Sequence, residues 1–544
     1  MMFSCLLLAL AEVVDFGSGG VGGYPEIEVS GVSGPARVRI VYATHPDGLG
    51  ERGDFWHETR ANYMGSGLWL PILPASTDRF DVFEINSNGT YRASLAQGLV
   101  RYAKWRVESG SAAVDSIRFV NDGIHSEERV VGSFCCSDDR FNRIWQASAR
   151  TCQLAAIPGR ERPLAVSGVH TSAVLGVSLP YLSDGAKRDR LVWSGDLWWA
   201  QRNMYAAFPL ESVYMPGSIR MLAANRTDDG YVQACPFPEA KGKLAAGEYG
   251  PFASDEFAAW FVPVLADHIL HTGDMKLAEE MMPTVRKLVG YLVRHSGDDM
   301  IFEQRLETCK HSCGLAVGGT SLHHRAYMNV LLWKTYSDAA SLARWTGDER
   351  SAVIFSGYAE RIAAAIRVRF WDGRLGALVL SQEEPHKLGF EANALALATR
   401  FATAAEAKTM LGHLKRHDHG KFQLLAVRGA FEYGDGAKAK ELIEAHNWTK
   451  LVADDWRGVH LMSECLALVR KGWGDEAHPD TAIAGVFTNY ILGVRPIEPG
   501  YRRYKAEPVA VPGIAWAKGR VPIPKGTVDV EWTLVDGKPQ VKVD

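Results

Sequence analysis

Long apolar runs are absent from this chain of 544 residues, and no segment approaches the roughly 20 apolar residues of a membrane-spanning helix. An excess of one charge sign is also missing, since 60 Lys and Arg residues face 63 Asp and Glu residues, for a net charge of −3. A balanced surface creates no global field that attracts nucleic acid or an acidic membrane. We therefore expect neither partner, and nothing in the composition predicts an oligomeric state.

Cysteine is scarce, with eight residues in the whole chain, too few for a disulfide scaffold. Cys309 and Cys313 enclose His311, but no second ligand pair follows at zinc spacing. We therefore predict no metal and no cofactor. A repeat of fixed period is missing as well, which argues against tetratricopeptide and ankyrin arrays.

The N-terminal residues give a mixed signal. Residues 3–11, FSCLLLALA, have the length of a signal-peptide core, but no Lys or Arg precedes them. The residues that follow already have the pattern of strand and turn. The sequence therefore favours a cytoplasmic protein over a secreted one, and a chain that begins inside a β-domain.

The apolar pattern divides the chain into three domains. Residues 1–128 alternate at period two, as in ARVRIVYAT, which predicts an antiparallel β-sandwich. Residues 129–495 carry apolar residues at helical spacing in segments such as DEFAAWFVPVLADHILHTG. Residues 496–544 return to alternation and predict a small C-terminal β-domain.

The helical segments, about a dozen joined by short turns, indicate the architecture of the middle domain. They predict a mainly α fold, an (α/α)6 toroid of six helical hairpins flanked by the two β-domains. An open α-solenoid also fits the same pattern.

The most informative segment is SDGAKRDRLVWSGD at residues 183–196, which combines carboxylates, cations and one Trp. Gly185 and Gly195 disfavour a long regular helix here. A loop that displays charge and an aromatic face suits a sugar site, because paired carboxylates perform acid–base chemistry and Arg tunes their pKa. The alternative is a solvated loop with surface ion pairs.

This segment and two others resemble the bacterial α-L-rhamnosidases of glycoside hydrolase family 78. SDGAKRDRLVWSGD is similar to the family's DCPQR[DE]-x-LGWTGD-like motif, and GVRPIEPGYRRYKAEP to the exit of its helical barrel. GIAWAKGRVPIPKGTVDVEW is similar to its C-terminal β-domain. The resemblance extends from about residue 12 to 544 in the same order, and it implies a six-hairpin glycosidase that acts on a carbohydrate.

The resemblance also implies two catalytic residues. The family's general acid is a Glu seven residues before the last Asp of the motif, which places the acid at Asp189, one methylene shorter. Its general base is a Glu late in the barrel, in a GATTxWE-like segment. GVHLMSE at residues 458–464 is similar to that segment and places the base at Glu464, with Ser463 where the family has Trp.

A further set of residues is expected to bind the sugar. Asp184, Trp193 and Asp196 match family positions, His478 lies near a family histidine, Trp456 stands close upstream of the base, and Arg188 supplies donors for hydroxyls. Asp255 opens a predicted helix, where it either binds sugar or stabilises the helix N-terminus. The expected set is Asp184, Arg188, Trp193, Asp196, Asp255, Trp456 and His478.

The resemblance implies inverting hydrolysis of a terminal α-L-rhamnosyl or related residue, with a protonated carboxyl on the leaving oxygen and a carboxylate behind a water. Arg188 and Arg190 flank Asp189 and favour its ionised form, whereas a general acid must be protonated. Gly185, Ala186 and Lys187 replace the family's Cys-Pro-Gln, so the chain is a divergent member. One alternative is a polysaccharide lyase or another six-hairpin glycosidase that acts on a uronic-acid-containing glycan. A non-catalytic sugar-binding protein is the second alternative.

Overall fold

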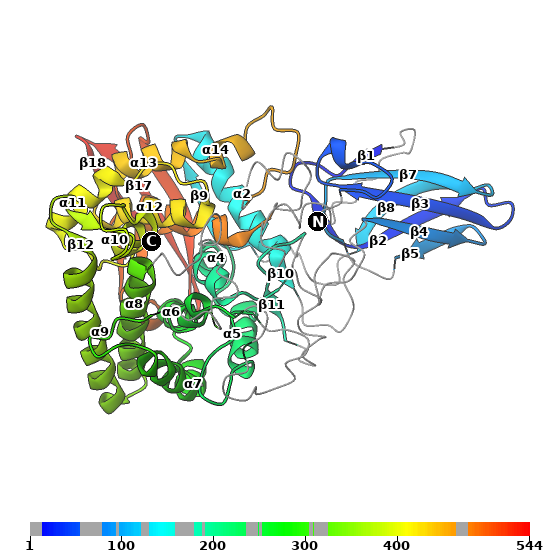
Figure 1. Cartoon of the computed structure of the whole chain (residues 1–544). Coiled ribbons are helices and arrows are strands. Elements are labelled where there is room, and N and C mark those ends of the chain that lie inside the picture. Colours follow the sequence, from blue (N-terminus) through cyan, green and yellow to red (C-terminus); the bar gives the residue numbers. More distant parts are fainter. Residues whose placement is uncertain are drawn as a thin grey trace.

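The structure is a computed structural model that describes residues 13–54, 79–93, 97–120, 130–157, 179–187, 191–235, 249, 253–303, 308, 325–463 and 477–544. Helices form the centre of the molecule, with a β-domain on one side and a second sheet on the other (Figure 1). Among the described residues, no helix combines the length and the hydropathy that a membrane crossing requires.

The N-terminal β-domain consists of two antiparallel sheets that share one core. The first has the order β1 (Val13–Asp15), β7 (Tyr102–Ser109), β3 (Ala36–Ala43) and β4 (Phe80–Ile85). In the second, β2 (Val21–Ser30) pairs with β5 (Gly89–Arg92), β6 (Gln97–Val100) and β8 (Ala113–Val120). Ile27 and Ile117 of the second sheet pack in one cluster with Val38 and Ile40 of the first. The alternation in the sequence buries one face of each sheet, and the predicted sandwich results.

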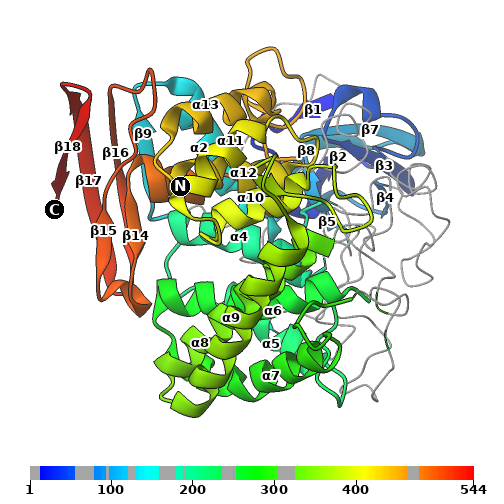
Figure 2. The ribbon, with the colours of Figure 1, turned by 60° about the vertical axis from the view of Figure 1, so that its left-hand side comes forward.

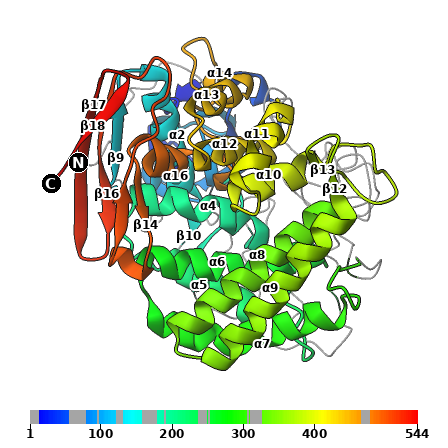
Figure 3. The same ribbon diagram turned by 90° about the vertical axis from the view of Figure 1, so that its left-hand side faces the viewer.

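The helical domain has an inner and an outer layer, seen in Figure 3. The inner helices are α4 (Ser194–Ala207), α6 (Asp255–Thr272), α8 (Arg325–Trp345), α10 (Phe390–Ala398), α12 (Gly420–Glu432) and α16 (Ala484–Val486), which the π-turn η6 (Phe487–Ile491) extends. The outer helices are α2 (Asp139–Ala155), α5 (Tyr214–Ala224), α7 (Met275–Arg294), α9 (Glu349–Phe370), α11 (Ala404–His413) and α13 (Gly436–Ala445).

Contacts close the inner layer into a ring. Each inner helix from α4 to α12 packs against the next, and α16 returns to pack against α4. The short helix η5 (Pro479–Thr481), directly before α16, fills the position between α12 and α4. The ring is therefore closed, as the toroid requires, and the open solenoid is excluded.

Burial distinguishes the two layers. On the outer helix α9, the buried residues recur every three or four positions and form one stripe: Ala352, Phe355, Ala359, Ile362, Ile366 and Phe370. The inner helix α6 is buried almost all round. It begins at the cap Ser254, whose hydroxyl accepts a hydrogen bond from the Phe257 amide, and it ends at Gly273 with φ of 71°. The helical periodicity of the sequence therefore predicts these elements correctly.

The C-terminal sheet has the order β18 (Lys538–Val543), β17 (Gly526–Val535), β16 (Trp516–Ile523) and β9 (Ser133–Cys136) (Figure 2). Trp532 is buried and donates its indole N–H to the Ile491 carbonyl at 2.7 Å, which attaches the sheet to the ring. Strand β9 comes from the range 129–495 that we assign to the barrel, because a four-residue strand carries little alternation in sequence. The domain limits at 128 and 495 stay a prediction.

Smaller elements connect these layers. They are the 3-10 helices η1 (Pro46–Gly48) and η7 (Pro499–Tyr501), the helix α14 (Trp448–Leu451), and the strand pairs β10 (Ala156–Ile157) with β11 (Tyr181–Leu182), β12 (Trp371–Asp372) with β13 (Ala377–Leu378), and β14 (Val494–Pro496) with β15 (Tyr504–Ala506).

Candidate active site

The polar segment 183–196 leads into the inner helix α4. Asp184 closes this segment on itself: its amide donates to the Leu191 carbonyl at 2.9 Å, and its carboxylate accepts from the Leu191 amide at 3.0 Å. Asp184 is buried, and its carboxylate fixes the conformation of the backbone through the hydrogen bond from Leu191. Arg188 and Asp189 lie outside the described residues.

Lys187 of the same segment reaches the N-terminal β-domain. Its ammonium lies 2.6 Å from the Asp54 carboxylate and donates to the Thr44 hydroxyl at 2.8 Å. Asp54 also pairs with Arg79 at 2.8 Å, and the three charged side chains are at most 2% exposed. We expected a loop that displays its charges, but the described part of the segment is buried, because the partners of its charges come from distant parts of the sequence.

Trp193 is the N-cap residue of α4 and packs against the ring of Phe257 with 5.6 Å between the ring centroids. Gly195 follows in the first turn, where a Cβ would come within 2.8–3.0 Å of the Phe257 ring. Glycine at this position therefore lets α4 and α6 approach closely. Trp193 is buried, and its ring packs against Phe257 of helix α6.

A buried lysine lies at the centre of the described site. Lys421, in the first turn of α12, forms ion pairs with Asp196 of α4 and with Asp480 of η5, the latter at 3.0 Å. All three side chains are at most 7% exposed. His478 lies beside this group, with its Nδ1 4.0 Å from Asp480 Oδ1. One cation thus faces two carboxylates in a region of low dielectric, where charge interactions are strong.

Two buried carboxyl groups open helix α6. Asp255 accepts a hydrogen bond from the Thr308 hydroxyl at 2.6 Å, and Glu256 accepts one from the Tyr327 hydroxyl at 2.9 Å. Burial raises the pKa of Glu256 to about 8, against the lowering effect of Tyr327 and Lys421. Glu256 is therefore protonated at neutral pH, which is the state a general acid needs.

These groups share one end of the ring. Asp196, Glu256, Tyr327 and Lys421 all stand in the first turn of an inner helix, and the carboxylates among them meet the positive end of a helix dipole. The same end faces the N-terminal β-domain, because Lys187 links the two. Acidic, basic and phenolic groups therefore converge at one mouth of the toroid.

Of the remaining expected residues, Trp456 is described and Glu464 is not. Trp456 donates its indole N–H to the Val459 carbonyl at 2.9 Å, and its ring lies 6.4 Å from that of His45 in the N-terminal β-domain. The described contacts of Trp456 are thus with Val459 and with His45 of the N-terminal β-domain. Glu464 lies outside the described residues, as do Cys309, His311 and Cys313.

Lys421, Asp480 and Tyr327 are the site residues that sequence reasoning missed. Lys421 follows HDHG at the start of helix α12, and Asp480 stands two positions after the expected His478. Neither position has a spacing that signals function by itself. Among the described residues, no group of three His, Cys, Asp or Glu side chains could hold a metal ion.

Comparison with known families fits this architecture. The model described as the bacterial α-L-rhamnosidase six-hairpin glycosidase domain matches residues 169–421, and that described as the bacterial α-L-rhamnosidase C-terminal domain matches residues 493–544. The ring and its flanking sheets thus define a six-hairpin glycosidase fold. Within that class, the chain belongs to glycoside hydrolase family 78.

Solved structures show the same fold at low sequence identity. The family 78 rhamnosidase of Bacillus sp. GL1 is 15% identical with a TM-score of 0.70, over 98% of this chain and 51% of that one. The Klebsiella oxytoca rhamnosidase with rhamnose bound is 15% identical with a TM-score of 0.64, over 88% and 86%. The Streptomyces avermitilis α-L-rhamnosidase with L-rhamnose is 15% identical with a TM-score of 0.65, over 96% and 46%.

The chain therefore spans about half the length of the Bacillus and Streptomyces enzymes and most of the length of the Klebsiella enzyme. No curated protein matches the sequence.

Proposed function

We propose that the protein is a glycoside hydrolase that releases terminal α-L-rhamnosyl or related residues with inversion at the anomeric carbon. The observation that carries this proposal is the buried group of Lys421, Asp196, Asp480 and Glu256 at one mouth of a family 78 ring. The structures of the Klebsiella and Streptomyces relatives contain rhamnose, which supports a carbohydrate as the substrate.

In the proposed reaction, Asp189 is the general acid and Glu464 the general base. Glu464 takes a proton from a water as its oxygen attacks the anomeric carbon, and the bond to the leaving oxygen breaks as Asp189 protonates that oxygen. The products are a free sugar of inverted configuration and an alcohol. The two carboxyl groups of an inverting pair stand roughly 6.5–9.5 Å apart to leave room for the water.

The described residues would bind and orient the sugar. Carboxylates accept hydrogen bonds from hydroxyls, and Asp196 and Asp480 are fixed in place by Lys421. Because these side chains are buried, water screens their charges little, and their interactions with a bound sugar are strong. Binding at this group would hold the sugar ring at the mouth of the toroid.

Asp189→Asn tests the acid. An aryl leaving group needs little protonation, so we expect kcat to fall by roughly 10²–10⁴-fold on a natural disaccharide and much less on an aryl glycoside. Asp418→Asn is the control, because Asp418 is an exposed aspartate, and its kinetics should stay unchanged. Equal losses on both substrates would show that Asp189 only holds the sugar.

The acid would then belong to Asp184, Asp196 or Glu256. Asp184 accepts a backbone hydrogen bond and Asp196 pairs with Lys421, whereas the raised pKa of Glu256 keeps it protonated at neutral pH. Glu256→Gln is therefore the next variant in that case.

Glu464→Ala tests the base. The loss of the base should lower kcat by a similar factor, and added azide should restore turnover and give a β-glycosyl azide. Glu441→Ala, an exposed glutamate, is the control. No rescue by azide would contradict the assignment of Glu464. An unsaturated product would identify a lyase, and a sugar that is bound and released unchanged would identify a binding protein.

A further inference from the structure

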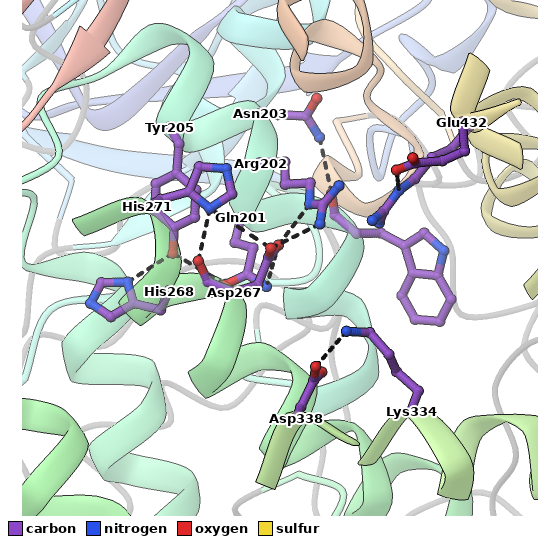
Figure 4. Close-up of polar contacts among 12 residues, drawn as sticks. Gln201, Arg202, Asn203, Tyr205, Asp267, His268, His271, Lys334, Asp338 and Glu432 are labelled. Atoms are coloured by element: carbon purple, nitrogen blue, oxygen red, sulfur yellow. Dashed lines mark hydrogen bonds and ion pairs between the residues drawn. The ribbon is translucent and has the colours of Figure 1, made fainter. Parts of the chain in front are cut away.

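A polar cavity lies at the end of the ring opposite to Lys421. It has a volume of about 230 Å³ and lies among the C-terminal halves of the inner helices, beside β14. Figure 4 shows the polar contacts of this region. The charged side chains that line it are Arg202, Asp267, Lys334, Asp338, Arg428, Glu432 and Arg495.

Two of its cations are each paired with a carboxylate of the same wall. Arg202 holds Asp267 through two parallel hydrogen bonds, Nε–Oδ2 at 2.7 Å and Nη2–Oδ1 at 2.8 Å. Lys334 lies 2.5 Å from Asp338, one turn further along α8. These pairs form part of the cavity wall, and each of the two cations already has a close counter-charge.

Arg428 differs from them. It is 8% exposed, and its Nε has no hydrogen-bond partner. The closest carboxylate oxygen, Glu432 Oε1, lies 3.8 Å from that nitrogen, too far for a hydrogen bond. Glu432 is already bound by Arg400 at 2.8 Å and by the Tyr490 hydroxyl. The guanidinium of Arg428 therefore lines the cavity over the Trp198 ring, 5.0 Å from its centroid, and shares its nearest carboxylate with Arg400 and Tyr490.

The charges of the wall favour an anion. Four cations and three carboxylates line the cavity, which leaves one positive charge in excess. Arg495 is among those cations, and its nearest carboxylate, Glu507, lies 4.0 Å away. The carboxylate nearest to Arg428 is engaged by two other groups, so an anion in the cavity would supply a further counter-charge and a hydrogen-bond partner for its Nε.

Size limits the ligand. A cavity of about 230 Å³ is smaller than the roughly 300–1,000 Å³ of sites for drug-sized molecules. Arginine binds carboxylate and phosphate groups through its planar fork of donors. We propose that this cavity is a binding site for a small oxyanion, a carboxylate or a phosphate, held by the guanidinium of Arg428 together with Arg495.

Calorimetric titration of the whole protein with inorganic phosphate and with D-glucuronate, at constant ionic strength, tests this site. We expect saturable binding of at least one probe, and the probe that binds identifies the phosphate or the carboxylate as the ligand group. Arg428→Gln should weaken that binding at least about tenfold, the equivalent of 1.4 kcal/mol. Arg400→Gln is the matched control, because Arg400 contacts the same Glu432 but does not line the cavity, and its affinity should stay within about twofold of the wild type.

The absence of saturable binding of both probes, or equal affinity in the wild type and Arg428→Gln, overturns the proposal. Should Arg428→Gln fail to fold, Arg428→Lys keeps the charge but loses the fork of donors. Its affinity should then fall about tenfold, and an unchanged affinity would count against the site in the same way.

Discussion

At the scale of single residues, the buried Lys421 of the candidate site gives a direct test of stability. Lys421→Met removes the ammonium that pairs with both Asp196 and Asp480, and breaking a buried ion pair costs about 3–5 kcal/mol of unfolding free energy. Urea unfolding measures this loss. Lys542 also stands between two carboxylates but on the surface, so Lys542→Met should change stability little. An equal loss of unfolding free energy in both variants would show that the ion pairs of Lys421 do not stabilise the fold.

Glu256 gives a prediction about pH. Burial raises its pKa from 4.5 to about 8, so the folded protein binds a proton that the unfolded chain releases between these values. The resulting stability is fully present below pH 4.5 and is lost as the pH rises through 8, by at most about 1.4 kcal/mol per pH unit. Urea unfolding from pH 5 to 8 should therefore show a decline in the wild type that Glu256→Gln lacks.

Glu432 serves as the comparison for this measurement. It is also buried, but Arg428, Tyr490 and Arg400 together outweigh burial and lower its pKa. Glu432→Gln should therefore keep the decline of the wild type over the same range. A parallel pH profile for Glu256→Gln and the wild type would mean that Glu256 is ionised in the folded protein.

At the scale of elements, one glycine sets the distance between α4 and α6. A Cβ on Gly195 would meet the Phe257 ring at 2.8–3.0 Å, so Gly195→Ala should cost about 1–3 kcal/mol through overpacking. Gly357 lies inside α9 with nothing within 4 Å, so Gly357→Ala should instead stabilise by about 0.5–1 kcal/mol. Thermal unfolding distinguishes the two, and a gain in stability from Gly195→Ala would contradict the packing of this helix pair.

The buried ion pairs between the polar segment 183–196 and the N-terminal β-domain give another prediction. Asp54→Asn leaves Lys187 and Arg79 without their anion in the interior, which should cost about 3–5 kcal/mol and lower activity, because Lys187 stands two residues before Asp189. Glu51→Gln removes an exposed ion pair with Arg106 in the same domain and should leave both properties unchanged. Full activity in Asp54→Asn would show that the β-domain does not support the site.

The elements also show what the sequence could predict. The apolar stripe of α9 and the alternation of β17 are local patterns, so the helical ring and the flanking sheets follow from them. Strand β9 could not be placed, because its partner β16 lies far along the chain. Lys421 and Asp480 could not be found for the same reason: their significance depends on the ring closure that brings α12, η5 and α4 together.

At the scale of the whole molecule, the toroid has polar groups at both ends. Helix α6 carries Glu256 at the end that faces the N-terminal β-domain and Asp267 near the opposite end, and α12 carries Lys421 and Glu432 in the same way. Inner helices buried on nearly all sides hold both groups in place. The fold therefore places a charged group at each end of the ring, and the end with Lys421 is the one that we propose as the glycosidase site.

The anomeric configuration of the first sugar released tests the central claim most directly. Proton NMR can follow the hydrolysis of an aryl α-L-rhamnoside by the wild-type protein from the first minutes. An inverting pair predicts that β-L-rhamnose appears first and that the α anomer grows only through mutarotation. Initial release of α-L-rhamnose, or no release of rhamnose at enzyme concentrations comparable to the substrate, would contradict the account.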